Sequence, residues 1–343
     1  MLIYVLRRLF LLIPILFGMT LIAFVVSHAM PTDPVVSAIG DRAAASPAIV
    51  TAYREKWGLN RPVPDQYLIY LGHLVHGDLG MSIYTHRPVA QDIEDYLPAT
   101  VELATTAIII SIGVAVPLGV LAAVRQGGAI DFFVRMISLL GVAMPIFFLA
   151  LSSVKVFYVW LGIVPAPSRL SLTLSPPPHV TGLYTIDSLI AGQFSTFLDA
   201  GAHLILPALV LAGWSVGLLL RITRTATLSM LRQDFPRTVR AKGARELFVI
   251  YRHVLRNALI PVVTVVGLSY GDLLSGSILI ETIFAWPGIG RYAYTAATTA
   301  DFPAILGVAL VVAFFYILVN LAVDVAYALL DPRVRSAVLG ARQ

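Results

Sequence analysis

The chain has 343 residues, of which 58% are hydrophobic and only 13% are charged, and its formal net charge is +5. Soluble domains carry about twice that charged fraction, so the composition indicates an integral membrane protein. The absence of cysteine excludes disulfides, thiolate metal sites and cysteine nucleophiles. The basic residues gather beside apolar runs without interleaved aromatic residues, which argues against a nucleic-acid partner.

Apolar runs predict the helices that cross the membrane. Each run approaches or exceeds the roughly 20 residues that a helix needs to span a bilayer. The six runs are Leu9–Val26, Leu103–Val124, Met136–Trp160, Leu204–Leu220, Ala258–Ile280 and Phe302–Val323. The fold class is therefore predicted to be all-α, a polytopic membrane protein with six transmembrane helices. The first run is longer than the core of a usual signal peptide, so we expect a retained helix within residues 1–30.

The distribution of positive charge predicts the orientation. With the N-terminus inside, the inside positions hold 16 of the 24 Lys and Arg residues and the outside loops hold seven. Positively charged loops resist translocation, so this alternation places both termini in the cytoplasm. Membrane lipid surrounds residues 97–330, the predicted transmembrane domain, and residues 331–343 form a cytoplasmic tail.

Two predicted outside segments differ in character. Residues 31–96 are too many for a simple turn, and their apolar spacing predicts amphipathic helices at Pro47–Trp57 and Gln66–His76. The second segment, Gly162–Ala202, is rich in Pro and Ser. We expect it to have little regular structure.

A basic loop, residues 224–257, separates the fourth and fifth apolar runs. Its pattern predicts helices at Arg237–Lys242 and Arg245–Asn257, with Gly243 providing the sharp turn between them. Two short helices joined in this way form a protrusion that a soluble partner can grip. The same charges would also hold anionic lipid headgroups, and the residue pattern alone leaves both interpretations open.

Several strings along the chain carry a resemblance to a known family. RTVRAKGARELFVIYRHVLRNALIPVVTVVGL, residues 237–268, with Arg237-Thr238-Val239 in place of Glu-Ala-Ala, resembles the EAA loop of ABC importer permeases in the dipeptide/oligopeptide/nickel family. Further similar strings are HGDLGMS (His76–Ser82), LPATVELA (Leu97–Ala104), ETIFAWPGIGRY (Glu281–Tyr292) and VDVAYALLDPRVR (Val323–Arg335). The insert TGLYTIDSLIAGQFSTFLDAGAHLILPALVLAG is similar to the B subunit of dipeptide permeases.

The resemblance implies a type I ABC importer permease fold and ATP-driven import of dipeptides or short oligopeptides across the cytoplasmic (inner) membrane. This chain would form half of the translocation pathway. The implied partners are a homologous second permease subunit, two ATPase subunits and an extracytoplasmic peptide-binding protein. The implied ATPase-coupling residues lie in the basic loop and are Arg237, Arg240, Ala241, Lys242, Gly243 and Arg245.

The chain itself is expected to be non-catalytic and to hold no cofactor. It has no P-loop pattern and no Gly-Lys pair, so ATP and Mg would be bound by the partner subunits. His73, His76 and His86 lack a third ligand at a suitable spacing, so we predict no metal site.

Two acidic residues are candidates for the translocation pathway, because charges within or beside membrane spans are often functional. Asp272 lies in the fifth run and would attract the ammonium end of a passing peptide. A packing role against a neighbouring helix or subunit remains an alternative. Glu102 lies at the outer mouth of the second run, where it would meet substrate or a binding protein, or simply occupy the interface.

Other functions remain open from the sequence. The same mechanism would serve nickel, glutathione or another small solute as cargo. A proton-coupled secondary transporter would need intramembrane acid pairs and usually inverted repeats, and neither is evident. A membrane scaffold without transport activity would bind no ATPase subunits.

Overall fold

The computed structural model describes residues 10, 13–22, 24–25, 35 and 45–330 of the chain. Within these residues the regular elements are all helices, and Met81 and Pro88 form one isolated β-bridge. The all-α prediction is therefore confirmed for the part of the chain that is described.

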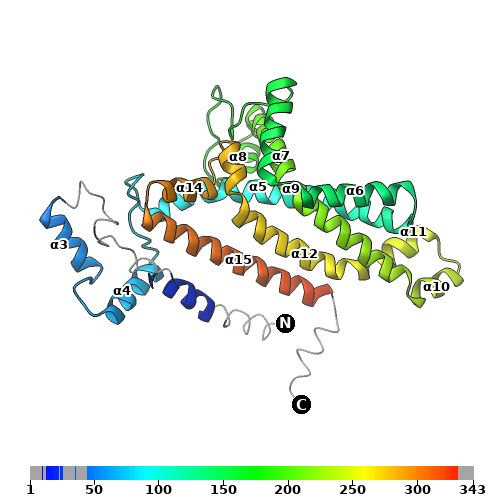
Figure 1. The fold of residues 1–343 in the computed structure, drawn as a ribbon, viewed down its shortest axis with the longest axis horizontal. Coiled ribbons are helices and arrows are strands. Elements are labelled where there is room, and N and C mark those ends of the chain that lie inside the picture. Colours follow the sequence, from blue (N-terminus) through cyan, green and yellow to red (C-terminus); the bar gives the residue numbers. More distant parts are fainter. Residues whose placement is uncertain (1–9, 11–12, 23, 26–34, 36–44, 331–343) are drawn as a thin grey trace, which may run out of the picture.

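Long helices packed against one another form the body of the molecule (Figure 1). They are α5 (Val89–Val124), α6 (Ala129–Ala143), α9 (Phe194–Leu231), α12 (Leu255–Gly276) and α15 (Phe302–Leu330). Pro117, Pro207 and Pro261 lie inside α5, α9 and α12, which continue through them. Helices in a membrane tolerate proline because neighbouring groups satisfy the freed backbone carbonyls.

Shorter helices cap the ends of this bundle or project from its side. They are α3 (Pro47–Lys56), α4 (Val63–Val75), α7 (Ile146–Ser153), η1 (Val154–Trp160), α8 (Tyr184–Ile190), α10 (Asp234–Ala241), α11 (Glu246–Phe248), η2 (Val249–Val254), α13 (Ile278–Ile283) and α14 (Ile289–Thr298). α3 and α4 lie at one end of the molecule, and α10 and α11 lie at the other (Figure 1).

Four described helical runs are long and apolar enough to cross a membrane, or five if one bent pair counts as a span. The four are Val89–Val124, Phe194–Leu231, Glu246–Ser275 and Phe302–Val323. The first predicted span, Leu9–Val26, lies partly outside the described residues. Its described portion includes a short apolar helix, Ile13–Ile22.

The third predicted span, Met136–Trp160, is not one straight helix but is broken at Pro145. α6 ends at Ala143, and the run formed by α7 and η1 points 101° away from it. The cause is Pro145, which lacks an N–H group and disfavours a helical conformation at the preceding residue. Met144 is accordingly extended, with φ −82° and ψ 129°. The 15 residues of α6 extend roughly 22 Å, less than the ~30 Å hydrocarbon core.

The predicted second outside segment, Gly162–Ala202, is more regular than expected, so this expectation is corrected. It contains α8 and the first turns of α9. Asp187 orders the preceding turn by accepting backbone hydrogen bonds from Val180 (3.2 Å), Thr181 (2.8 Å) and Gly182 (2.8 Å). Burial opposes ionisation of Asp187, but these hydrogen bonds and that of the Thr181 hydroxyl outweigh it and lower the pKa of the carboxyl group.

The predicted first outside segment forms both helices that its apolar spacing indicates, α3 and α4. Trp57 and His73 pack these helices together, with ring centroids 4.3 Å apart. The hydroxyl groups of Thr20 and Tyr67 lie 2.9 Å apart and connect α4 to the N-terminal region. The two helices therefore form a small unit joined to the first predicted span.

Candidate functional site

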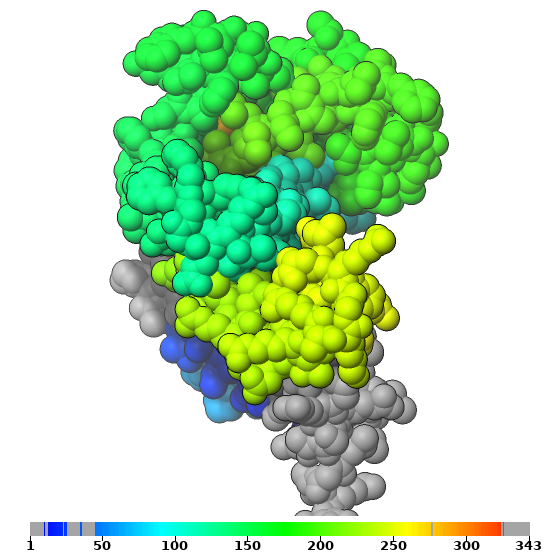
Figure 2. Space-filling model, turned by 90° about the vertical axis from the view of Figure 1, so that its right-hand side faces the viewer, coloured from blue at the N-terminus to red at the C-terminus, as the bar shows by residue number. Residues whose placement is uncertain are grey.

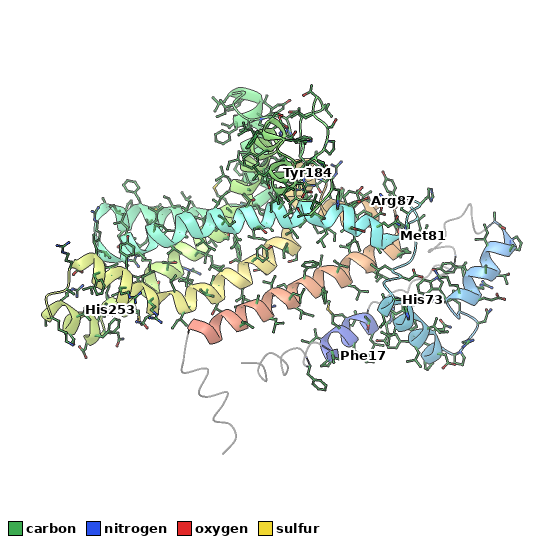
Figure 3. All side chains as sticks on the ribbon, turned by 180° about the vertical axis from the view of Figure 1, so that it is seen from behind. Phe17, His73, Met81, Arg87, Tyr184 and His253 are labelled. Carbon is green, nitrogen blue, oxygen red and sulfur yellow. The ribbon has the colours of Figure 1, made fainter. Side chains whose placement is uncertain are left out.

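The basic loop lies at the end of the molecule opposite α3 and α4, as the labels His253 and His73 show in Figure 3. Only Arg232 and Gln233 separate α10 from the 38-residue α9. At the other side of the loop, η2 continues directly into α12. A movement of the loop therefore also moves α9 and α12, because no long flexible linker separates the loop from either helix.

The turn of the loop depends on Gly243, whose φ is +81°. Residues other than glycine rarely adopt this backbone conformation, so the turn requires glycine at this position. The predicted turn at Gly243 is therefore confirmed. Pro236 of α10 is buried, as are Val249 and Val254 of η2, and these residues hold the loop on the bundle. The loop is thus a fixed protrusion with a sharp reversal at its tip.

Arg240 forms an ion pair with Glu246 on the far side of this turn. Its Nε and Nη2 atoms donate to Glu246 Oε2 at 2.9 Å and Oε1 at 2.7 Å. A two-point contact of this kind fixes the orientation of both side chains. The predicted coupling residue Arg240 therefore braces the turn at Gly243. Glu246 was not among the predicted residues, although a carboxylate on the other side of a glycine turn is a signal for such a pair.

The remaining predicted coupling residues are exposed on the loop. Arg237 lies 3.9 Å from Asp234, a distance that leaves most of its donors unused, while Ala241, Lys242 and Arg245 are also exposed. Beside them are exposed apolar side chains that the sequence analysis did not single out, namely Leu247, Phe248 and Tyr251. Arginine and aromatic residues together are typical of protein–protein contacts.

Glu102, predicted at the outer mouth of a span, is buried in an ion pair with Arg169. Its Oε2 accepts from Arg169 Nη2 at 2.7 Å, and its Oε1 accepts from the backbone N–H (2.8 Å) and hydroxyl (2.6 Å) of Thr185. Arg169 also donates to the Gly182 carbonyl at 2.7 Å and stacks on the Tyr184 ring at 3.7 Å. Glu102 therefore fastens the loop before α8 to α5. Its predicted contact with substrate stays a prediction.

Glu281 is a fully buried carboxylate that the sequence analysis quoted only as part of a motif. It accepts hydrogen bonds from the hydroxyl groups of Thr100 and Ser277, both at 2.6 Å, and from the N–H of Arg291 at 2.8 Å. The last donor belongs to the first turn of α14, where the helix dipole favours a negative charge. A Cβ atom on Gly288 would lie 2.5 Å from Glu281 Oε2, which explains the glycine in this motif.

Two further buried carboxylates hold the same end of the bundle together. Asp301 accepts from the Ser82 hydroxyl, and Asp92 accepts from the hydroxyl groups of Thr85 and, at 3.0 Å, Tyr292. Burial, together with the hydrogen bond to Asp92, raises the pKa of Tyr292 and keeps it a donor. These contacts tie the segment before α5 to α14 and α15. They are structural contacts between distant parts of the chain.

Asp272 lies on the face of α12 that points away from the bundle. It is exposed, as are Leu268 and Ser275 on the same face. Its carboxylate has no hydrogen-bond or ion-pair partner among the described residues. Because an unpaired carboxylate is costly in lipid, this residue requires water or a partner from outside the chain.

The three histidines considered as metal ligands are used separately. His73 Nδ1 lies 3.3 Å from Asp78, and His76 Nδ1 lies 2.7 Å from the Gly72 carbonyl oxygen. Across the described ranges, no cluster of three or more His, Asp or Glu side chains is arranged to bind a metal ion.

Together these features define a polytopic helical membrane subunit with a rigid loop joined to its membrane-crossing helices. Residues 115–336 match the family of binding-protein-dependent transport system inner membrane components, and residues 1–104 match the N-terminal region of such components. The chain therefore belongs to this family, the membrane permeases of ABC importers.

Similar proteins cover nearly the whole chain. It is 44% identical over 335 residues to the dipeptide transport system permease protein of Alkalihalophilus pseudofirmus, covering 98% of this chain and 100% of that protein. It is 44% identical to the probable D,D-dipeptide transport system permease protein of Escherichia coli (92% and 93% covered) and 37% identical to an oligopeptide transport system permease protein of Bacillus subtilis (96% and 98%). A solved structure of the MetNI methionine ABC transporter aligns with a TM-score of 0.49 at 15% identity, covering 68% of this chain and 93% of that chain.

The family confirms the resemblance seen in the sequence. The chain is a non-catalytic, multi-pass permease subunit of the inner membrane, and it serves a binding-protein-dependent importer.

Proposed function

We propose that this chain forms half of the translocation pathway of an ATP-driven importer of dipeptides or short oligopeptides. The proposed cargo rests on one observation: permeases that are 42–44% identical over nearly the full chain are named for dipeptide transport. A homologous second permease subunit completes the pathway. Two ATPase subunits bind ATP and Mg, and an extracytoplasmic peptide-binding protein delivers the cargo.

The proposed orientation places the basic loop and both termini in the cytoplasm. It is supported by the excess of Lys and Arg at the positions assigned to the inside. In this orientation residues 31–96, with α3 and α4, lie outside, and residues 97–330 form the transmembrane domain around the coupling loop 224–257. Residues 1–30 supply the first span, and residues 331–343 are the cytoplasmic tail.

The basic loop is the proposed coupling element. Arg237, Ala241, Lys242 and Arg245 face the ATPase subunit, while Arg240 and Gly243 shape the turn that presents them. Because α10 adjoins α9 and η2 continues into α12, closure of the ATPase subunits on ATP would move both helices together. The two permease subunits then change from inward-facing to outward-facing.

Asp272 is the proposed pathway residue of this subunit. It is supported by the exposed carboxylate of Asp272, which has no partner among the described residues and lies on a helix long and apolar enough to cross the membrane. In a water-filled path it would attract the ammonium group of a peptide. Glu102 would act at the outer mouth by holding the adjoining loop in place, since both of its oxygens are already hydrogen-bonded.

Uptake of a labelled dipeptide tests the proposal, in cells whose peptide import depends on this complex. We expect unlabelled dipeptides to compete and ATP depletion to stop uptake while the proton gradient is maintained. Competition by nickel or glutathione in place of peptides would contradict the cargo. Uptake that follows the proton gradient after ATP depletion would contradict the mechanism.

A further inference from the structure

Helices α6 and α9 pack against one another near the end of the molecule that carries the basic loop. In Figure 2 the blue-green start of α6 lies above the yellow part of this loop. The Ser138 hydroxyl of α6 donates to the Gly217 carbonyl oxygen of α9 at 2.6 Å. Seven residues earlier in α6 and seven later in α9, Asp131 accepts two hydrogen bonds from Arg224, and the one from Nη2 is 2.9 Å long. These contacts show that the helices are antiparallel, and they fix the register.

Two arginines, Arg135 and Arg221, occupy level positions between these contacts. Arg135 lies three residues before Ser138, and Arg221 lies four residues after Gly217. Spacings of three and four residues keep each arginine on the side of its helix that carries the contacts. Both side chains are exposed, that of Arg135 by 57%. The two guanidinium groups therefore emerge beside one another at the edge of the helix pair.

Neither guanidinium group is neutralised by the rest of the described chain. Arg135 donates from Nε to the Asp131 carbonyl oxygen at 3.3 Å, and its Nη groups donate no hydrogen bond to a described residue. The Arg221 side chain makes no hydrogen bond or ion pair within the described ranges. The acidic residues within 120–140 and 216–262 are Asp131, Asp234 and Glu246, and each already forms an ion pair with another arginine. Two adjacent positive charges therefore remain uncompensated.

The same two arginines mark the boundary of the apolar spans. Arg135 directly precedes the third predicted span, and Arg221 directly follows the fourth. Arginines at such positions place their charge at the level of the lipid headgroups. Towards the hydrocarbon the helices expose apolar side chains, with Leu139 one turn beyond Arg135 and Trp214 two turns beyond Arg221. The surface is therefore cationic at the boundary and apolar beyond it.

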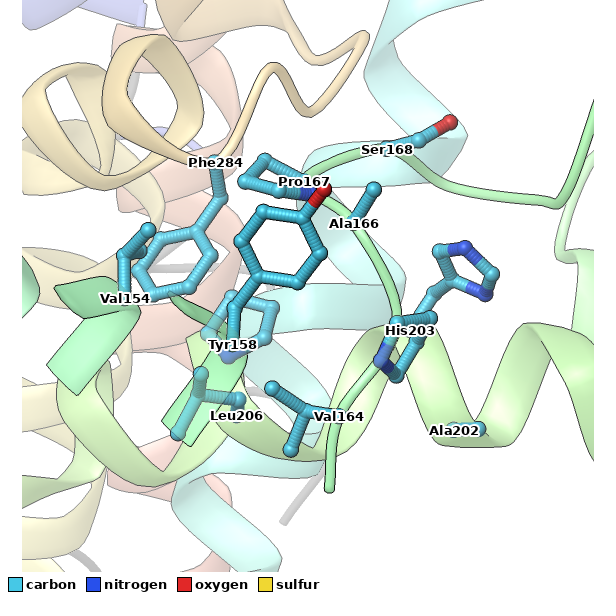
Figure 4. Close-up of a pocket in the computed structure, with 12 residues that line it drawn as sticks. Val154, Tyr158, Val164, Ala166, Pro167, Ser168, Ala202, His203, Leu206 and Phe284 are labelled. Carbon is cyan, nitrogen blue, oxygen red and sulfur yellow. The ribbon is translucent and has the colours of Figure 1, made fainter. Parts of the chain in front are cut away.

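The pocket between η1 and α9 offers no comparable site for an anion (Figure 4). Its walls include Val154, Tyr158, Leu206 and Phe284, and no Lys, Arg, Asp or Glu side chain lines it. An anion in this pocket would lose its hydration without gaining a charged partner. The arginines on α6 and α9 supply that partner.

An anionic phospholipid has the same arrangement of charged and apolar parts as this surface. Guanidinium groups bind phosphate oxygens through paired N–H donors, and basic sites between membrane helices bind anionic headgroups. A soluble phosphate ion would match the arginines but leave Leu139 and Trp214 uncovered. A single arginine at a membrane boundary is common, because long cationic side chains reach the headgroups. Two arginines held level on neighbouring helices by fixed contacts define a site.

We propose that Arg135 and Arg221 bind the phosphate group of an anionic phospholipid, whose acyl chain lies against Leu139 and Trp214. The phosphate removes the repulsion between the two arginines. It also joins α6 to α9 between the two contacts that set their register, close to the point where α9 leads into the basic loop. This inference goes beyond the proposed function and does not depend on the cargo.

Trp214 provides the reporter for a test, because it lies seven residues from Arg221, or about 10 Å along α9. The purified complex is placed in zwitterionic nanodiscs that contain brominated phosphatidylglycerol or, at equal content, brominated phosphatidylcholine. Bromine in the acyl chains quenches a nearby indole ring. The difference between each protein and its Trp214→Phe counterpart isolates the signal of this residue. The ratio of quenching by the two lipids measures the preference for the anionic headgroup.

Arg135→Gln/Arg221→Gln removes the proposed site. Arg125→Gln/Arg232→Gln is the matched control, because it removes two exposed arginines from the same end of the molecule. We expect phosphatidylglycerol to be preferred about tenfold in the wild type and in the control, since each arginine contributes to the attraction. The preference should disappear in the site variant.

Three results would overturn the proposal. Equal quenching by the two lipids in the wild type would show that no anionic lipid is selected, as when an ATPase subunit covers the arginines in the complex. This result does not depend on whether a variant assembles. An unchanged preference in the site variant, or an equal loss in the control, would show a response to overall charge. Abolition of the wild-type preference by inorganic phosphate, with sodium chloride of equal ionic strength having no effect, would show that the arginines bind the free ion.

Discussion

Arg240 and Glu246 form a two-point ion pair across the turn at Gly243, with nitrogen–oxygen distances of 2.9 and 2.7 Å. The pair joins the end of α10 to the start of α11, the two elements that the turn separates. An exposed pair of this kind contributes only about 0.5 kcal/mol to stability. Its effect is therefore expected on the shape of the loop more than on the folding of the chain.

Reversing one charge of this pair should impair coupling. Arg240→Glu places two carboxylates across the turn, and we expect peptide-stimulated ATPase activity of the complex to fall at least threefold. The double variant Arg240→Glu/Glu246→Arg restores opposite charges and should recover most of it. If the double variant is as impaired as Arg240→Glu alone, Arg240 contacts the ATPase subunit directly and does not act through Glu246.

The buried pair of Glu102 and Arg169 makes a prediction about stability. Arg169→Ala leaves a buried carboxylate without its charged partner. We expect the free energy of unfolding to fall by about 3–5 kcal/mol. We expect a lower unfolding temperature and faster proteolysis within residues 161–183. The double variant Glu102→Gln/Arg169→Met removes both charges and should be closer to wild type. Equal damage in both variants would show that the charge pair is not the cause.

Packing around Glu281 predicts a strict requirement for Gly288. Gly288→Ala would place a Cβ atom 2.5 Å from the Glu281 carboxylate and from the Thr100 hydroxyl, so the hydrogen-bonded group must shift. Such overpacking costs about 1–3 kcal/mol. Gly201→Ala in α9 is the control, because nothing lies within 4 Å of its Cβ position. Thermal unfolding of the two variants in lipid measures the difference, and equal melting temperatures would contradict the packing argument.

The lowered pKa of Asp187 predicts how the loop before α8 responds to acid. Because the native pKa lies below the unfolded value of about 3.9, the stabilisation is fully present above about pH 4. It is lost as the pH falls through the native pKa. Proteolysis of this loop should therefore accelerate below about pH 4 in the wild type. Asp187→Asn should already be cleaved quickly at pH 7, with little further change at lower pH. If cleavage of this variant accelerated below pH 4 as steeply as in the wild type, the assigned role of Asp187 would be contradicted.

The sequence was sufficient for features that depend on local patterns. Apolar runs located α5, α9, α12 and α15, apolar spacing located α3 and α4, and Gly243 marked the turn of the basic loop. Each signal lies within a short window, so residue type and spacing determine the outcome.

The sequence was insufficient where residues far apart in the chain meet. Glu102 and Arg169 are 67 positions apart, and Thr100 and Glu281 are 181 apart, so no local pattern links them. The size of the bend at Pro145, 101°, could not be predicted for another reason. Prolines lie inside three other membrane helices without ending them, and the packing that decides between a continuous helix and a break is not encoded locally.

The most direct test of the central claim is ATPase activity of the complex in lipid, with and without the peptide-loaded binding protein, for a series at Gly243. Since φ at Gly243 is +81°, Gly243→Asn should be mild and Gly243→Val and Gly243→Pro progressively more severe. We predict that stimulation falls in this order, to below a tenth of wild type in Gly243→Pro, while the chain still inserts in the membrane. Unchanged stimulation in Gly243→Pro would contradict the assignment of the basic loop as the coupling element.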